Sequence, residues 1–214
     1  MTAEADPTLL RQCLRGAARA VSNAADELNQ LDAVAGDGDL GITMASASRI
    51  VETQLDLEPR GDPAGVLFGR IGVALAREVP STSGTLVATG FLRAAKATKE
   101  GAPDLVNLIK CMTAATEGIM DRGKAELGDK TMVDVLVPVC DELRAAELRG
   151  ADLGEALTSA LARANTAVDA TADMVPRRGR ASWMVDNAAG HPDGGCRLIA
   201  IGLGAALSAL QTSE

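Results

Sequence analysis

The chain has 214 residues, which is the size of one large domain or two very small ones, and we take residues 1–214 as a single domain. Its formal net charge is -8, and its aromatic residues are one Trp and two Phe with no Tyr. Nucleic-acid surfaces need basic patches and stacking platforms, and an anionic membrane repels an acidic chain, so neither partner is expected.

The four cysteines occur singly along the chain, at Cys13, Cys111, Cys140 and Cys196. This spacing predicts neither a disulfide framework nor a zinc site. The N-terminal stretch MTAEADPTLLRQC lacks the pattern of a signal peptide, and no run of some 18 apolar residues is evident. We therefore expect a cytoplasmic protein with reduced thiols.

Apolar residues recur with the helical period of 3.6 along the chain, and no segment has the alternation of a strand. We expect about eight helices, with Pro138 bending the sixth. Asp62 is the expected cap of the third, with Pro63 in its first turn. The expected helices cover about residues 10–31, from the GDGDLG loop to 57, 63–79, from SerThrSerGly at 81–84 onward, from Pro103-Asp104 to 123, 130–148, 152–175 and 195–210.

The loop LDAVAGDGDLG at residues 31–41 contains GDGDLG, which matches the dinucleotide-binding pattern G-x-G-x-x-G. That pattern has meaning only between a strand and a helix, and the residues before this loop are helical, so a dinucleotide oxidoreductase is disfavoured. As an EF-hand counted from Asp37, the loop has Ile42 where glycine is needed and Ser48 where a bidentate Glu is needed. Both alternatives fail on these residues.

Three carboxylates remain within eight residues of this glycine-rich loop, namely Asp32, Asp37 and Asp39. Oxygen ligands of this kind suit Mg²⁺, which takes its other ligands from water and substrate phosphates. The alternative is a solvated acidic turn at the start of the second helix.

Three further polar loops fall at helix ends: PSTSG at 80–84, GKAELGDKTM at 123–132 and GRASWMVDNAAGHPDGG at 179–195. A helix that begins with Ser or Thr and Gly offers free amides to a phosphate group. Arg180 provides a fixed positive charge and Lys130 a mobile one. Each feature alone is compatible with an ordinary cap or surface charge, and their combination predicts a phosphate site.

In order and spacing, LDAVAGDGDLG, STSGTL, DRGKAELGDKTMVDVLVPV and GRASWMVDNAAGHPDGG resemble the L subunit (DhaL) of dihydroxyacetone kinases over nearly the whole chain. The resemblance implies an all-α barrel of about eight antiparallel helices, with ADP or ATP held by the loops at one end. It implies two Mg²⁺ ions bound by Asp32, Asp37 and Asp39, with Asp37 shared. The implied nucleotide contacts are Leu40, Gly41, Ile42, Thr43, Thr82, Ser83, Gly123, Met132, Arg180, Asp193, Gly194 and Gly195.

The single histidine, His191, cannot form a catalytic cluster by itself, and the resemblance places the ketose-binding histidine on a partner K subunit. Phosphoryl transfer depends mainly on positioning and charge neutralisation, which suits this division. This chain departs from the family pattern at Leu40, in the run from Pro80 to Thr85 and at Gly194. These departures lie around the implied nucleotide site, so they bear on nucleotide binding more than on the fold.

The resemblance leaves several functional alternatives open. The donor is either ATP exchanged after each cycle or a retained ADP rephosphorylated by a phosphoenolpyruvate-dependent, DhaM-like phosphotransferase component. The acceptor is dihydroxyacetone or another short ketose, such as a tetrulose. A different class of function is a regulatory module that reports nucleotide state to a transcriptional regulator.

Overall fold

The computed structural model describes residues 7–57, 62–98 and 104–213, and all regular elements within those ranges are helices. The all-α class expected from the sequence is therefore confirmed. The α-helices are α1 (Pro7–Asn23), α2 (Ala25–Ala33), α3 (Leu40–Asp56), α4 (Ala64–Glu78), α5 (Thr82–Ala97), α6 (Leu105–Gly123), α7 (Val133–Leu148), α8 (Leu153–Ala170), α9 (Val185–Ala188) and α10 (Gly194–Gln211), and the 3₁₀ helices are η1 (Thr171–Asp173) and η2 (Arg180–Trp183).

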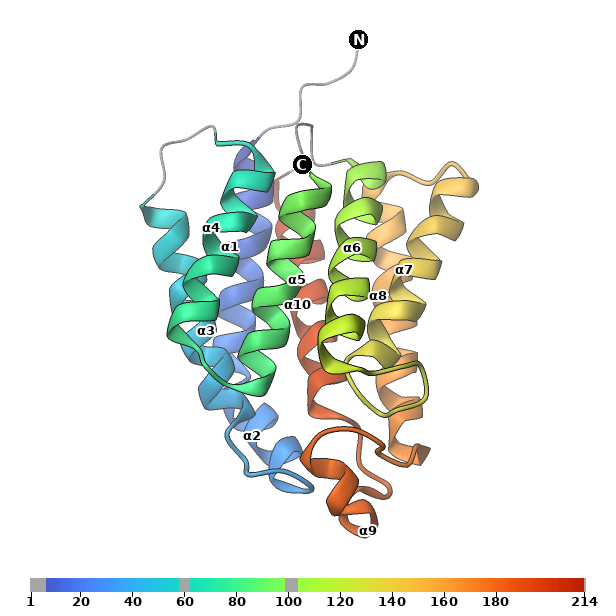
Figure 1. Ribbon diagram of the computed structural model, residues 1–214. Helices are drawn as coiled ribbons and strands as arrows, with labels where there is room; N and C mark the ends of the chain where they lie inside the picture. The colour runs from blue at the N-terminus through green and yellow to red at the C-terminus, as the bar shows by residue number, and fades with distance from the viewer. Residues whose placement is uncertain (1–6, 58–61, 99–103, 214) are drawn as a thin grey trace.

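In the part of the chain that the structure describes, eight long helices form a closed antiparallel ring, as the resemblance implied. Around the ring, α1 contacts α3, each of α3 to α7 contacts the next in order, and α10 packs between α8 and α1. Figure 1 shows the beginning of α1 and the end of α10 at one end of this barrel. The α2–α3, α4–α5, α6–α7 and α8–α10 connections lie together at the opposite end, called here the loop end (Figure 1).

Several helix boundaries differ from those expected. The first expected helix breaks at Ala24, and α2 then continues through Asp32, so this acid lies in a helix rather than in the loop. Pro63, not Asp62, is the N-cap of α4, and Asp62 pairs with Arg70 at 3.4 Å instead. Asp104 is the N-cap of α6, which begins at Leu105, and Pro103 lies outside the described residues. The helix containing Pro138 begins at Val133 and not near residue 130.

The core is built mainly from aliphatic side chains and alanines. On one side of the barrel, α8 buries Ala156, Ala160 and Ala164 completely. These alanines are four residues apart and so share one helix face, where their small size lets α7 pack closely through Val139 and Leu143. On the other side, large aliphatic residues of α3 and α4 fill the interior.

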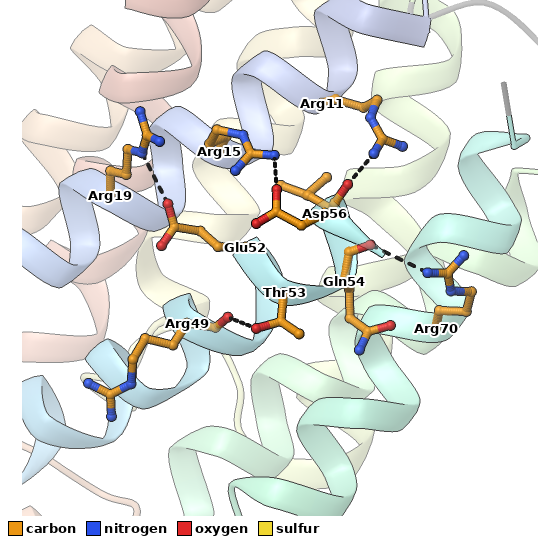
Figure 2. Close-up of polar contacts among 10 residues, drawn as sticks. Arg11, Arg15, Arg19, Arg49, Glu52, Thr53, Gln54, Asp56 and Arg70 are labelled. Carbon is orange, nitrogen blue, oxygen red and sulfur yellow. Dashed lines mark hydrogen bonds and ion pairs between the residues drawn. The ribbon is translucent and has the colours of Figure 1, made fainter. Parts of the chain in front are cut away.

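The wall formed by α1, α3 and α4 is also joined by polar contacts at its surface (Figure 2). Arg15 and Arg19 of α1 pair with Asp56 and Glu52 of α3 at 2.7 and 3.0 Å. Arg70 of α4 donates to a backbone carbonyl of α3 at 3.4 Å. Solvent-exposed ion pairs contribute only about 0–1 kcal/mol each, so apolar burial dominates the stability of this wall.

Helix α10 is apolar on average, although it is not an uninterrupted run of apolar residues. It has 18 residues with a mean hydropathy of 1.3, which is long and apolar enough to span a membrane by length and composition alone. One such helix is weak evidence, because a core helix meets the same criteria. Here α10 packs along both α1 and α8, and 33% of the segment is buried.

Candidate functional site

The three loop-end acids predicted as metal ligands come together in the structure. Carboxylate oxygens of Asp32, Asp37 and Asp39 all lie within 4.8 Å of one another. One oxygen of Asp32 accepts hydrogen bonds from the amides of Gly38 and Asp39, at 2.8 and 3.1 Å. Gly38 has a φ of +75°, which favours glycine, and so the loop folds back over the end of α2. The donor set fits a hard divalent cation such as Mg²⁺.

Asn29 fixes the start of α3 beside these acids. Its side-chain oxygen accepts hydrogen bonds from the amides of Gly41 and Ile42, at 2.7 and 3.2 Å. Gly41 is required here because a Cβ at this position would lie only 1.8 Å from the carbonyl oxygen of Ala25. These two amides are therefore occupied within the protein, and a ligand would have to use other atoms of residues 40–43.

Arg180 lies beside the acidic loop, as its predicted role requires. It belongs to η2, and its guanidinium forms an ion pair with the carboxylate of Asp37. Both side chains are substantially exposed, at 63% and 43%. The contact places a permanent positive charge at the edge of the three carboxylates, where an anionic ligand can reach it.

Lys130 is not the mobile surface charge that the sequence predicts. It is buried, and its ammonium donates hydrogen bonds to the carbonyl oxygens of Ala188 at 2.7 Å and Met174 at 3.2 Å. Burial lowers the pKa of this ammonium. Lys130 therefore joins the α6–α7 loop to the segment that carries Arg180, and its charge is directed away from solvent.

Two buried acids stabilise the α6–α7 loop. The carboxylate of Asp134 accepts hydrogen bonds from the amides of Gly128 and Thr131, at 2.5 and 2.8 Å. Asp129 accepts from Arg178 at 2.9 Å, and this hydrogen bond is the main reason that the pKa of Asp129 is lowered. Together these contacts fix the tight turn that contains Lys130.

Asp193 caps α10 and connects it to neighbouring elements. Its carboxylate accepts the amide of Cys196 at 2.7 Å, and its own amide donates to the hydroxyl of Thr171 at 2.9 Å. Burial is the main cause that raises the pKa of Asp193 to about 6. The thiol of Cys196 donates to the carbonyl of Thr131 at 2.9 Å, and burial raises its pKa.

Four of the predicted nucleotide contacts meet at the base of α10. A Cβ on Gly194 would lie 3.0 Å from a methyl carbon of Leu40, and one on Gly195 would lie 3.5 Å from the Cβ of Met132. The side chains of Leu40 and Met132 are buried in the core, at 8% and 6% exposed. These two residues can therefore offer a ligand mainly backbone atoms.

The start of α5 lies at the same end of the barrel. Ser81 caps this helix by accepting the amide of Gly84 at 2.9 Å. Thr82 and Ser83 occupy its first turn, where amides have no acceptor within the helix. Gly123 ends α6 against α5, because a Cβ there would lie 3.4 Å from a methyl carbon of Leu86.

The loop end therefore contains all the residues that the resemblance implied, and it adds several that the sequence reasoning missed. His191 is exposed, and its amide donates to the carbonyl of Ala188. The additional residues position loops through hydrogen bonds of their side chains. They are Asn29, Asp129, Asp134 and Arg178, with Lys130 in its new structural role.

Comparison with known proteins gives concordant matches. The family model described as the DAK2 domain matches residues 34–208. The phosphoenolpyruvate-dependent dihydroxyacetone kinase, ADP-binding subunit DhaL, of Escherichia coli is 35% identical over 180 residues, covering 83% of this chain and 85% of that protein. The L-erythrulose kinase of Pectobacterium atrosepticum is 35% identical over 193 residues, covering 87% of this chain and 32% of that protein.

A solved structure matches nearly the whole barrel. The crystal structure of the dihydroxyacetone kinase from C. freundii in complex with AMP-PNP and Mg²⁺ superposes with a TM-score of 0.75 and 26% identity. The match covers 97% of this chain and 34% of that chain. The chain thus spans most of the E. coli relative, but only about a third of the erythrulose kinase and of the C. freundii enzyme.

Proposed function

Since the chain belongs to the DAK2 domain family, we propose that it is the nucleotide-binding subunit of a kinase for dihydroxyacetone or a related short ketose. In this proposal residues 1–214 form one cytoplasmic ADP- or ATP-binding domain, which supplies a phosphoryl group to a ketose held by a K-type partner. The observation that carries the proposal is the group of three carboxylates within 4.8 Å, with the guanidinium of Arg180 beside it.

The acids are proposed to hold two Mg²⁺ ions, with Asp37 ligating both and Asp32 and Asp39 completing the set. When bound, Mg²⁺ neutralises phosphate charge and so favours phosphoryl transfer. Asp32 keeps one oxygen engaged with the amides of Gly38 and Asp39 and has the other available as a ligand. If Asp37 ligates a cation, its ion pair with Arg180 is weakened, and the guanidinium is then free to donate to phosphate oxygens.

The nucleotide is proposed to bind across the loop end. Amides in the first turn of α5, at Thr82 and Ser83, are suited to phosphate oxygens. Backbone atoms near Gly194, Leu40 and Met132 form an adjoining wall. The remaining predicted contacts, Gly41, Ile42, Thr43, Gly123, Asp193 and Gly195, lie around these residues at the same end.

The relatives' names support both the division of labour and the acceptor class. The E. coli relative is named as a subunit, and the acceptor-binding groups would therefore be on another chain. That relative belongs to a phosphoenolpyruvate-dependent kinase, so a DhaM-like donor component is one candidate partner of this chain. The alternative phosphoryl donor is ATP, exchanged after each cycle. The L-erythrulose kinase matches at the same identity and makes a tetrulose a second candidate acceptor.

The proposal is tested by reconstituting the protein with the K-type subunit from the same organism. Dihydroxyacetone and erythrulose are offered as acceptors, each with ATP or with the phosphoenolpyruvate system as donor. We expect phosphorylation of at least one ketose, and loss of this activity in Asp37→Asn. Nucleotide binding without transfer to any ketose under all four conditions would contradict the kinase function and support a regulatory role.

A further inference from the structure

Residues 174–188, called here the η2 segment, are fastened at both ends by one side chain. The ammonium of Lys130 donates to the carbonyl of Met174 at 3.2 Å and to that of Ala188 at 2.7 Å. Helix η2, which begins at Arg180, lies between these two points. Lys130 therefore closes the base of a loop whose middle carries the guanidinium beside the acidic loop.

The residue before Lys130 attaches the same segment closer to Arg180. The backbone carbonyl of Asp129 accepts the amide of Arg177 at 3.0 Å. The carboxylate of Asp129 also accepts a hydrogen bond from the guanidinium of Arg178 at 2.9 Å, within an ion pair. Two consecutive residues of the α6–α7 loop thus hold the η2 segment at its ends and at the residues just before Arg180.

The η2 segment has few apolar contacts that could hold it otherwise. Among residues 175–187, only Pro176 is buried. Hydrogen bonds inside the segment, such as that from the hydroxyl of Ser182 to the carbonyl of Gly179 at 2.7 Å, fold it locally. A segment with little buried apolar surface has low local stability of its own. The contacts from the α6–α7 loop are therefore expected to decide where the segment lies.

The turn that provides these contacts is itself fixed and also reaches the predicted nucleotide site. The carboxylate of Asp134 accepts the amides of Gly128 and Thr131, one on each side of the two anchoring residues. Met132, a predicted nucleotide contact, follows directly in the sequence. One turn thus connects two parts of the site, namely the backbone at Met132 and the guanidinium of Arg180.

We propose that Asp129 and Lys130 are positioning residues that hold the guanidinium of Arg180 where it meets the nucleotide phosphates. This inference rests on the proposed function, in which Arg180 contacts phosphate. Both residues are only 5% exposed, and we assign them no contact with the nucleotide themselves. A charged group that is held in place before binding loses less conformational freedom when the ligand arrives, and so contributes more to affinity.

A double-mutant cycle on ADP binding in Mg²⁺, measured by isothermal titration, tests this coupling. We expect Arg180→Ala to raise the Kd by about 10- to 150-fold and Lys130→Met by about 5-fold or more. When Arg180 is already alanine, Lys130→Met should change the Kd by less than about 2-fold, because no guanidinium remains to be positioned. Equal effects of Lys130→Met in the two backgrounds would overturn the proposal.

Asp129→Asn separates positioning from simple electrostatics by the sign of its effect. The substitution removes a negative charge, so long-range electrostatics alone predicts tighter binding of anionic ADP. Positioning predicts weaker binding, by about 3-fold, because a neutral amide holds the guanidinium of Arg178 less strongly than a carboxylate does. This nearly isosteric variant also keeps the test decisive if Lys130→Met does not fold. Tighter or unchanged binding of ADP would overturn the proposal.

Two control variants match Lys130→Met in destabilisation and in charge. Leu55 is 1% exposed in the core and lies near the end of α3 that is away from the loop end, so Leu55→Ala destabilises the fold without reaching the site. Lys124→Met removes the same charge from the same loop at an exposed position. We expect both to stay within about 2-fold of the unmodified Kd, with circular dichroism verifying that each is folded. A loss in either control equal to that in Lys130→Met would overturn the proposal.

The same measurements separate this inference from the proposed function. If the unmodified protein does not bind ADP in Mg²⁺, the proposed function is wrong. If it binds ADP but Lys130→Met and Asp129→Asn match Lys124→Met, the proposed function stands and the positioning role is wrong.

Discussion

Replacing Lys130 by Met should destabilise the loop end of the barrel. The substitution removes an ammonium that donates to the carbonyl oxygens of Ala188 at 2.7 Å and Met174 at 3.2 Å. Each of these two hydrogen bonds from a charged group contributes about 1.5–3 kcal/mol to the free energy of unfolding. The variant recovers part of the loss because it no longer buries a charge. We therefore expect a loss of about 2–4 kcal/mol, which corresponds to a fall in Tm of roughly 4–16 °C for a chain of this size.

The control is Lys124→Met, because Lys124 is an exposed lysine of the same loop. Its φ is +52° and that of Lys130 is +59°, so Met meets a similar backbone conformation at both positions. Urea unfolding and hydrogen exchange of the amides near residue 188 measure global and local stability. We expect Lys124→Met to stay within about 0.5 kcal/mol of the unmodified protein. Equal stability of the two variants would refute the structural role of Lys130.

Three other substitutions test separate parts of the account. Arg180→Ala should weaken ADP binding in Mg²⁺ by about 1.5–3 kcal/mol, measured by isothermal titration, and an unchanged Kd would exclude its phosphate contact. Asn29→Ala leaves two amides of α3 without their acceptor and should lower the free energy of unfolding by about 1–3 kcal/mol and reduce Mg²⁺ affinity; a variant with normal stability would contradict this role. The pKa of Asp193 is raised from 3.8 to about 6, so the folded state binds more protons than the unfolded state between about pH 4 and 6. The contribution of Asp193 to the free energy of unfolding therefore falls as pH rises through this window, by up to about 3 kcal/mol. Asp193→Asn keeps a capping side chain and should remove this part of the dependence of the unfolding free energy on pH. An identical pH dependence in the variant would refute the assignment.

Local pattern was sufficient to predict the class of fold and the grouping of the three acids at a helix end. Helical periodicity marked the long helices, and the polar loops between them marked the end where the acids lie. The three carboxylates were predictable because they lie within eight residues of sequence, so local chain geometry brings them together. The break at Ala24 was not predictable, because both flanking segments have helical periodicity.

Contacts between residues distant in sequence explain what the pattern missed. Lys130 reaches carbonyl groups 44 and 58 residues away, and no local feature distinguishes it from a surface lysine. Asn29 binds amides 12 and 13 residues away across the acidic loop, so its role depends on how α2 and α3 pack. Such roles follow from tertiary structure, whereas the carboxylates follow from composition and spacing.

The central claim is that the acidic loop binds nucleotide phosphates through a metal ion, and thermal melts of nucleotide-stripped protein test it most directly. The four conditions are EDTA, Mg²⁺, ADP in EDTA, and ADP with Mg²⁺. Without cations, the charges of Asp32, Asp37 and Asp39 oppose those of ADP. A ligand at 100 times its Kd adds about 2.7 kcal/mol to the free energy of unfolding. We therefore expect ADP with Mg²⁺ to raise Tm by roughly 5–11 °C, more than either ligand alone. The variant Asp37→Asn should lose this increase. An equal increase with ADP in EDTA would contradict the claim.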